Sequence, residues 1–272
     1  MSTWKTISSW WRDSGHSRRE WRCRTLRTQA RVSARQERIV GWDQAKLAGA
    51  TILVAGAGGI GGEIVEGLVQ KGAGDVHVAD FDTVSPTNLN RQKFTRGDLW
   101  RNKAVCLARG ISRRGFMGTR LVAYPVATQE IDVGSIKPDV IVCAVDNQIP
   151  TTRLDVCRIA RRHRVPAVFT GVTPDAGGGY VFAQQPGHAC WNCALRPELQ
   201  LPATAAMCPE SPASVDILKV LGGLALYAVD TVLMRRPRDW NCWYVSLGTA
   251  GLGGPVLVRP RPECPVCGGD GG

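Results

Sequence analysis

The sequence lacks an uncharged apolar run of the roughly 20 residues that a membrane-spanning helix requires. The nearest candidate, residues 215–234, is interrupted by Asp216, Lys219 and Asp230, so we expect a buried helix there. The N-terminus also lacks the apolar segment of an export signal. We therefore expect neither membrane insertion nor secretion, and the sequence predicts a cytoplasmic protein.

Cysteine is scarce for a disulfide-stabilised fold, since ten cysteines are spread over 272 residues. Four of them stand in two CxxC pairs, which in a chain without an export signal favours metal binding over disulfides. With 44% hydrophobic and 21% charged residues, the chain can bury a sizeable core and is not broadly disordered. Its length allows one large α/β domain or two small ones.

Acidic residues are few at the start of the chain. The first 38 residues hold ten Lys or Arg against three acids, which is +7 of a total net charge of +11, and four of the nine tryptophans. We therefore predict a basic, Trp-rich arm over residues 1–34. It could dock to an acidic partner, RNA or an anionic membrane, or be a solvated extension whose tryptophans pack on a neighbouring subunit. An Arg-rich transit peptide is a third interpretation.

From residue 51 onward, β-rich runs alternate with segments of helical periodicity. Strands are expected at residues 51–55, 76–79, 119–125, 139–144 and 165–170, and helices at residues 60–71, 99–112 and 150–162. This alternation predicts an α/β fold, with a Rossmann-like, mostly parallel sheet and helices on both faces.

The pattern changes after residue 171. We expect an edge strand or hairpin at 180–184, an irregular stretch at 196–212, the longest helix at 214–234, and antiparallel closing strands at 242–247 and 256–258. No internal repeat or linker is visible, so the sequence predicts one domain in addition to the arm.

A glycine-rich turn follows the first predicted strand, where Gly56, Gly58, Gly59 and Gly61 form the pattern GxGxxG before a helix. Such glycines permit a tight turn and let phosphates approach the N–H groups at the helix N-terminus. Asp80 stands 24 residues after Gly56, at the end of the second predicted strand, where an acid can bind a ribose hydroxyl. The pattern indicates a nucleotide site.

Two cations beyond this site indicate the kind of nucleotide chemistry. Arg91 is followed twelve residues later by Lys103. A dehydrogenase needs no such pair beyond its pyrophosphate, whereas an enzyme that attacks a triphosphate does, because charge builds up on the phosphates during displacement. Surface salt bridges are the alternative interpretation.

A carboxylate follows the next predicted strand, since Asp146 and Asn147 come directly after the run at residues 139–145. The carboxyl ends of strands line the ligand crevice of an open α/β sheet, and a carboxylate there can hold Mg²⁺ bridged to phosphates. Asp146 could also cap the following helix, and the two roles are compatible.

The two CxxC pairs are Cys190 with Cys193 and Cys264 with Cys267, separated by 70 residues. Four thiolates are the tetrahedral ligand set of Zn²⁺ and leave no open position, so we expect a structural zinc site. A redox CxxC is the alternative.

Together, these four motifs resemble the ThiF/MoeB/HesA superfamily, whose larger relatives are the ubiquitin-activating enzymes. The resemblance predicts an adenylation domain over residues 35–267 and a Gly-rich tail at 268–272. In the family, the second arginine of an RxxRQ-like element reaches the partner subunit's ATP, and Arg35 holds that place here. The upstream arginine of the element is replaced by Val32.

The resemblance also implies roles for the other site residues, with ATP and Mg²⁺ as cofactors beside zinc. Asp80 would bind the ribose, and Asp146 would bind the magnesium. Asn88, Arg91 and Lys103 would bind the phosphates. The full set of expected nucleotide contacts is Gly56, Gly58, Gly59, Gly61, Asp80, Asp82, Asn88, Arg91, Gln92, Lys103, Asp146 and Asn147.

Cys208 lies fifteen residues after Cys193, before the longest predicted helix. Many family members carry a cysteine in this segment that forms a thioester or persulfide-linked adduct, so Cys208 is a candidate nucleophile together with the candidate catalytic residues Arg35, Arg91, Lys103 and Asp146. No activating base is adjacent to it, although a helix N-terminus can lower the pKa of a thiol. Five other cysteines fit buried apolar positions better: Cys23, Cys106, Cys143, Cys157 and Cys242.

The resemblance implies a homodimeric adenylyltransferase that activates the C-terminal glycine of a ubiquitin-like or sulfur-carrier protein ending in Gly-Gly. A conjugating or sulfur-transfer protein would be a further partner, and we expect no membrane or nucleic-acid partner. Two alternatives remain open. One is an adenylating enzyme of peptide-antibiotic or tRNA modification, and the other is a non-catalytic subunit that binds nucleotide or carrier.

Overall fold

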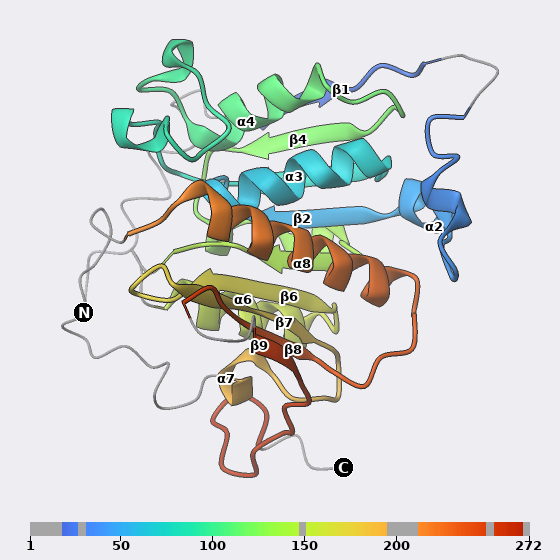
Figure 1. Cartoon of the computed structure of the whole chain (residues 1–272), viewed down its shortest axis with the longest axis vertical. Coiled ribbons are helices and arrows are strands. Elements are labelled where there is room, and N and C mark those ends of the chain that lie inside the picture. The colour runs from blue at the N-terminus through green and yellow to red at the C-terminus, as the bar shows by residue number, and fades with distance from the viewer. Residues whose placement is uncertain (1–17, 27–30, 147–150, 195–211, 249–252, 269–272) are drawn as a thin grey trace.

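The computed structural model describes residues 18–26, 31–146, 151–194, 212–248 and 253–268. Within these ranges the strands form a nine-stranded sheet of order β1-β4-β3-β2-β5-β6-β7-β8-β9 (Figure 1). The strands are β1 (Arg19–Arg22), β2 (Thr51–Ala55), β3 (Asp75–Ala79), β4 (Arg120–Tyr124), β5 (Val140–Cys143), β6 (Ala167–Val172), β7 (Gly178–Gln184), β8 (Cys242–Ser246) and β9 (Gly253–Val256).

The five central strands, from β4 to β6 in spatial order, are parallel, and β7, β8 and β9 close the sheet in antiparallel orientation. The predicted sheet is thus confirmed, although the last closing strand lies at Gly253–Val256 and not at residues 256–258. The alternative of an edge strand at residues 180–184 is wrong, because β8 pairs with the side of β7 that faces away from β6. The sequence did not predict β1, which comes from the assigned arm and pairs antiparallel with β4.

Helices cover both faces of the sheet, as predicted, with α3, α4 and α8 in front of it in Figure 1 and α6 behind it. The α-helices are α2 (Gln44–Gly49), α3 (Gly59–Lys71), α4 (Lys103–Ser112), α5 (Val133–Ile136), α6 (Thr152–Arg162), α7 (Trp191–Ala194) and α8 (Val215–Leu233). Single 3₁₀ turns lie at η1 (Gln36–Arg38), η2 (Pro86–Asn88), η3 (Arg96–Asp98) and η4 (Thr128–Glu130). None of the helices in the described ranges is long and apolar enough to cross a membrane.

The sheet separates two hydrophobic cores. On β2, Ile52 and Val54 pack into the core shared with α3 and α8, whereas Leu53 packs into the core shared with α6. All three side chains are buried. A parallel strand that is covered on both faces needs such a continuous apolar run, and each buried side chain of this size contributes about 1.5–3 kcal/mol to stability.

Helices α3 and α8 pack closely because glycines face the partner helix. A Cβ at Gly59 or Gly67 of α3 would overlap Leu218 or Leu226 of α8, respectively. Helix α3 ends at Lys71, and the next residue, Gly72, caps it in the left-handed conformation with φ +79°. Because α3 begins only four residues after the end of β2, its N-terminus lies at the carboxyl edge of the sheet.

The predicted start of the helix at residue 99 is wrong, because α4 begins at Lys103. The side chain of Asn102 caps the helix by accepting a hydrogen bond from the N–H of Val105 at 3.1 Å. The preceding residues instead pair with the segment after β3, through hydrogen bonds from Trp100 N to Val84 O and from Val84 N to Arg101 O, both 2.9 Å.

Candidate functional site

The glycine-rich turn joins β2 to α3 and can be built only with glycine at two of its positions. Gly56 has φ +96°, and a Cβ there would lie 2.7 Å from the carbonyl oxygen of Ala144. A Cβ at Gly61 would overlap the Gly56 carbonyl, whereas a Cβ at Gly58 would meet nothing within 4 Å. The turn is thus tight on its inner side and open on its outer side, where the N–H groups and dipole of the 13-residue helix α3 favour an anion.

Asp80 follows β3, and its carboxylate stabilises this turn through hydrogen bonds. Its Oδ2 accepts a hydrogen bond from the N–H of Ala57 at 2.7 Å, and its Oδ1 accepts one from the N–H of Asp82 at 2.8 Å. Burial raises the pKa of Asp80 to about 6, although Lys103 and the two N–H donors oppose the increase. Each oxygen keeps a lone pair that could accept a hydrogen bond from a ribose hydroxyl.

Lys103 is held beside the same group. Its ammonium forms a partly buried ion pair with Oδ2 of Asp82 at 2.9 Å, and its backbone N–H donates to the Asp82 carbonyl at 2.8 Å. The side chain of Asn102 adds hydrogen bonds to the carbonyls of Asp80 and Asp82 at 2.7 and 3.2 Å. This network places the ammonium of Lys103 beside the glycine turn. A bound phosphate could replace the Asp82 carboxylate as the partner of this ammonium.

The other expected phosphate ligands lie on the turn that contains η2. Asn88 is buried, and its Oδ1 accepts a hydrogen bond from the N–H of Ser85 at 3.0 Å, which closes the turn. The guanidinium of Arg91 donates to the Thr87 carbonyl and to Oδ1 of Asn90. Within the described ranges, the buried Oε1 of Gln92 has no hydrogen-bond partner. A bound group could supply a donor to that oxygen.

The residue that joins this turn to α3 was not predicted from the sequence. Lys93 forms ion pairs with Glu63 at 2.8 Å and with Glu66 at 2.7 Å, and Glu66 also pairs with Arg114. Two acids one helical turn apart on α3 were the available signal. Lys93 therefore anchors the segment that carries Arg91.

Asp146 lies at the end of β5, the strand next to β2, and is exposed. The N–H of Ala144 donates to the Ala55 carbonyl at 2.8 Å, so the chain before Asp146 runs beside the glycine turn. Asn147 lies outside the described residues. The structure thus brings the turn, Asp80, Asp82, Lys103 and Asp146 to one edge of the sheet.

The structure does not bring Arg35 to this edge of its own chain. The adjacent residue, Gln36, donates from Nε2 to the carbonyl of Lys71 at 2.8 Å. Lys71 is the last residue of α3, and a 13-residue helix is about 20 Å long. In Figure 1 the segment leading into α2 accordingly lies at the end of the sheet opposite the arrowheads of β2 and β4. Arg35 therefore sits at the wrong end of α3 to complete its own site.

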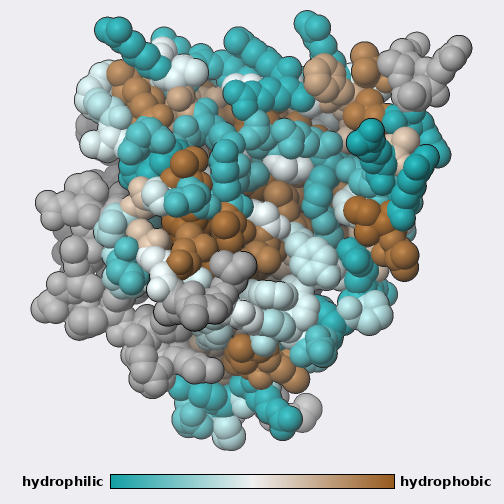
Figure 2. All heavy atoms as spheres, in the orientation of Figure 1, coloured by the Kyte–Doolittle hydropathy of each residue, from teal (hydrophilic) through white to brown (hydrophobic). Residues whose placement is uncertain are grey.

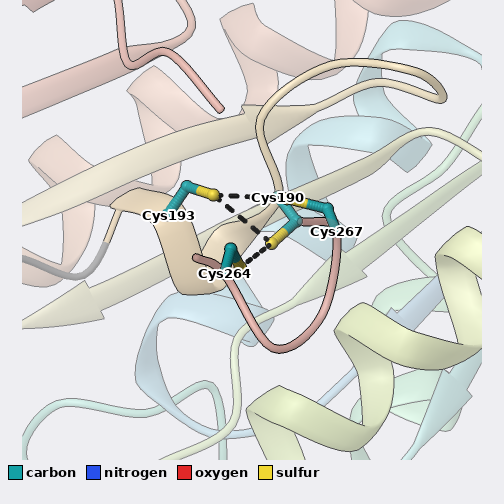
Figure 3. A group of neighbouring side chains, drawn as sticks. All are labelled: Cys190, Cys193, Cys264 and Cys267. Carbon is teal, nitrogen blue, oxygen red and sulfur yellow. Dashed lines mark hydrogen bonds between the residues drawn. The ribbon is translucent and has the colours of Figure 1, made fainter. Parts of the chain in front are cut away.

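The four cysteines of the CxxC pairs converge, with Cys190 and Cys193 at α7 and Cys264 and Cys267 on the C-terminal segment (Figure 3). All four Sγ atoms lie within 4.8 Å of one another, with separations of 3.8 Å for Cys190–Cys193, 3.6 Å for Cys190–Cys264 and 3.3 Å for Cys193–Cys267. A Zn–S bond of about 2.3 Å places tetrahedral sulfurs about 3.8 Å apart. The cluster therefore fits zinc.

Neighbouring groups act differently on the four thiols. A hydrogen bond with Cys157 together with burial raises the pKa of Cys190, and burial raises the pKa of Cys193 and Cys267. The amide of Asn192 donates to Sγ of Cys264, and the N–H of Arg261 donates to Sγ of Cys193, both at 3.4 Å. Burial opposes ionisation, but the hydrogen bonds from Asn192 and from backbone N–H groups lower the pKa of Cys264 to about 6. Such donors orient the ligands of a structural metal site.

The remaining cysteines divide into two groups. The five that were predicted to be buried are all buried, and they form no disulfide with one another: Cys23, Cys106, Cys143, Cys157 and Cys242. Cys208, the candidate nucleophile, lies outside the described residues.

The fold and site define a mixed α/β protein with a glycine-rich turn between β2 and α3 and a four-cysteine cluster. The model of the ThiF family matches residues 29–247, so the chain belongs to the ThiF family. It is 31% identical to the sulfur carrier protein adenylyltransferase of Thermus thermophilus, over 83% of this chain and 84% of that protein. It is 30% identical to the SAMP-activating enzyme E1 of Haloferax volcanii, over 84% of each.

A likeness among solved structures supports the fold. The structure of E. coli MccB with ATP matches with a TM-score of 0.66 and 19% identity, over 83% of this chain and 68% of that chain.

Proposed function

We propose that this protein is an ATP- and Mg²⁺-dependent adenylyltransferase that activates the C-terminal glycine carboxylate of a small ubiquitin-fold carrier protein ending in Gly-Gly. The observation that carries the proposal is the hydrogen-bonded group of Asp80, Asp82 and Lys103 at the glycine turn, with Asp146 three residues after the end of the neighbouring strand β5. The activities for which the Thermus and Haloferax relatives are named support the same reaction.

In this reaction a carboxylate oxygen bonds to the α-phosphorus of ATP, and the bond to the bridging oxygen of pyrophosphate breaks. The main barrier is repulsion between two anions, because the attacking carboxylate is already ionised and needs no general base. Lys103 and Arg91 would bind the phosphates and reduce that repulsion. Asp146 would hold the magnesium ion, which supplies further charge neutralisation on the phosphates.

The position of Arg35 supports a homodimer in which each chain completes the other's site. Apolar side chains gather over α8 in Figure 2, and the exposed hydrophobic residues there include Val220, 38% exposed, and Tyr227, 42% exposed. Val40, five residues after Arg35, is 89% exposed. We propose that a second copy covers these residues and receives Arg35 at its ATP site.

We further propose that the four-cysteine cluster holds a structural zinc ion. It would join the C-terminal segment to α7, because the two pairs of ligands come from segments 70 residues apart. Cys208 is proposed as the nucleophile of a later thioester step, which would hand the carrier to a conjugating or sulfur-transfer protein.

A second candidate function is adenylation of a peptide. MccB, whose fold this chain shares, is named as a microcin C7 biosynthetic enzyme. A free peptide and a folded carrier would both present a terminal carboxylate to the site. The two functions therefore differ in whether surfaces around the site also bind the folded body of a carrier.

ATP–pyrophosphate exchange tests the proposed function. Purified protein is mixed with each small ubiquitin-fold protein ending in Gly-Gly that is encoded in the same genome. We expect one of them to stimulate exchange, and the activity to be lost in Lys103→Ala and Asp146→Ala but retained in Cys208→Ala, because the thioester step follows adenylation. Exchange at the wild-type rate in Asp146→Ala would remove the magnesium role. Stimulation by free peptides and by no folded carrier would favour the second candidate.

A further inference from the structure

Trp100 combines two features that do not stabilise the folded chain. Its side chain is 72% exposed, and its backbone adopts the left-handed conformation with φ +65°. A bulky residue with a positive φ is a strained outlier, and such strain is concentrated at functional sites. A glycine or asparagine would adopt this conformation at lower cost. The side chain must therefore be explained by something other than the stability of the chain itself.

The turn around Trp100 is rigid without any help from the indole. The buried carboxylate of Asp98 accepts hydrogen bonds from the N–H and hydroxyl of Thr95 at 2.8 and 2.7 Å and pairs with Arg109 at 2.5 Å. The N–H of Trp100 donates to the Val84 carbonyl at 2.9 Å. These contacts hold the backbone in place, so the exposed indole projects from a fixed point on the surface.

This turn lies beside the proposed adenylation site. Trp100 is three residues before Lys103, and its segment pairs with the residues that follow Asp80. The segment between β3 and α4, coloured teal in Figure 1, lies at the carboxyl edge of the sheet. Phe81, on the paired segment, is 47% exposed. Two large aromatic side chains thus face solvent near the entrance of the site.

The charge around Trp100 is positive. Arg96 and Arg101 are exposed on either side of it, and neither forms an ion pair within the part of the chain that the structure describes. Tryptophan and arginine are the residue types that dominate binding energy at protein interfaces. A partner with an apolar depression and an acidic rim would complement this surface.

We propose that Trp100, Phe81, Arg96 and Arg101 form a docking surface for the folded body of the carrier protein, and that Trp100 is its anchor. The inference rests on the proposed function, because a carrier must dock close to the site that receives its tail. The hydrogen-bonded turn holds the backbone of Trp100 before binding, so that little backbone freedom is lost in the complex.

Two variants separate this role from a structural one. Trp100→Gly and Trp100→Asn remove the anchor and relieve the strain, so we expect a melting temperature no lower than that of the wild type. The KM for the carrier in ATP–pyrophosphate exchange should rise about tenfold or more. The KM for a synthetic peptide of the carrier's last six residues should not change, because the peptide occupies only the tail site.

Lys137→Gly is the matched control. Lys137 is exposed and has φ +51°, but it precedes β5 at the amino edge of the sheet. This variant relieves similar strain and should leave both KM values unchanged.

Each other outcome overturns the inference. A lower melting temperature in Trp100→Asn would make the indole structural. Weaker binding of ATP alone to the variant, measured by calorimetry, would show that the indole contacts the nucleotide. Dissociation of the variant into monomers in analytical sedimentation would show that the indole contacts a second copy of the chain. An unchanged KM for the carrier would refute the docking role while leaving adenylation intact, whereas absence of exchange in the wild type would refute the proposed function itself.

Discussion

The guanidinium of Arg153 donates two hydrogen bonds to the carbonyl oxygen of Val145, from Nη2 at 2.7 Å and from Nε at 3.1 Å. It packs against Gly171 of β6, where a Cβ would lie 2.9 Å from Nη2. Because Val145 precedes Asp146, an arginine in the first turn of α6 fixes the backbone that carries the proposed magnesium ligand.

Arg153→Ala should therefore raise the Mg²⁺ concentration needed for half-maximal ATP–pyrophosphate exchange by about tenfold, the usual effect of removing a group that orients a metal ligand. Gly171→Ala, which displaces the guanidinium, should act in the same direction. Arg158→Ala is the control, since Arg158 lies on the same helix, is exposed and has only a 3.8 Å ion pair with Asp155. An unchanged Mg²⁺ dependence in Arg153→Ala would show that this contact does not position Asp146.

Lowering the pH should weaken recognition of the ribose. The pKa of Asp80 is raised to about 6, mainly by burial, so its carboxylate becomes protonated below that pH and accepts hydrogen bonds less well. The ratio of the Kd of 2′,3′-dideoxy-ATP to that of ATP should fall as the pH is lowered from 7.5 to 5. Titration of the phosphates cancels in this ratio, so a ratio independent of pH would contradict the ribose role of Asp80.

The same pKa predicts an effect on stability. The folded protein binds this proton more tightly than the unfolded chain, so the contribution of Asp80 to the free energy of unfolding decreases as the pH rises from about 4 to about 6. Asparagine does not titrate, so Asp80→Asn does not lose stability in this way as the pH rises. The melting temperature of the variant minus that of the wild type should therefore be larger at pH 7.5 than at pH 4.5. A constant difference between the two proteins would show that the pKa of Asp80 is not raised by folding.

The purified protein should contain about one zinc ion per chain, held by the four cysteines. Because the metal closes a long loop, replacing Cys264 with serine should lower the melting temperature and increase amide exchange in β8 and β9. Metal analysis and hydrogen exchange measure these effects. A metal-free protein with an unchanged melting temperature and a Cys190–Cys193 disulfide would contradict the zinc assignment.

If Arg35 acts on the partner's ATP, two inactive variants should restore each other. Arg35→Ala and Asp146→Ala each disable both sites of a homodimer, but in a mixed dimer one site keeps both residues. Random mixing gives a ceiling of about one quarter of the wild-type rate when the sites are independent. An arginine that served its own chain would give no recovery at any mixing ratio.

The sequence predicted the elements whose periodicity is strong and local. The central strands and α8 are confirmed because apolar runs and helical spacing specify them directly. The start of α4 was predicted four residues too early, since the capping by Asn102 and the pairing of Trp100 with Val84 outweigh an apolar residue at 99. Strand β1 was missed because its four residues gain their structure only by pairing with β4.

For the candidate site, motif spacing indicated which residues would gather but not how they are held. The ion pair of Lys103 with Asp82 and the contacts of Arg153 join segments that are 21 and 8 residues apart. Such contacts depend on tertiary packing, which no local pattern encodes. The distance of Arg35 from its own site is likewise a property of the folded chain, set by the anchoring of Gln36 at the far end of α3.

Strand β1 also has a consequence for solubility. It pairs with every residue of β4 from Arg120 to Ala123, so the buried strand at this end of the sheet has no open edge. A shortened protein beginning at residue 35 would keep all the candidate site residues but expose the hydrogen-bonding groups of β4 beside Leu121 and Val122. An uncovered apolar edge is a template for pairing with another molecule. The basic arm looks dispensable from its composition, but its strand β1 therefore protects β4 from pairing with another molecule.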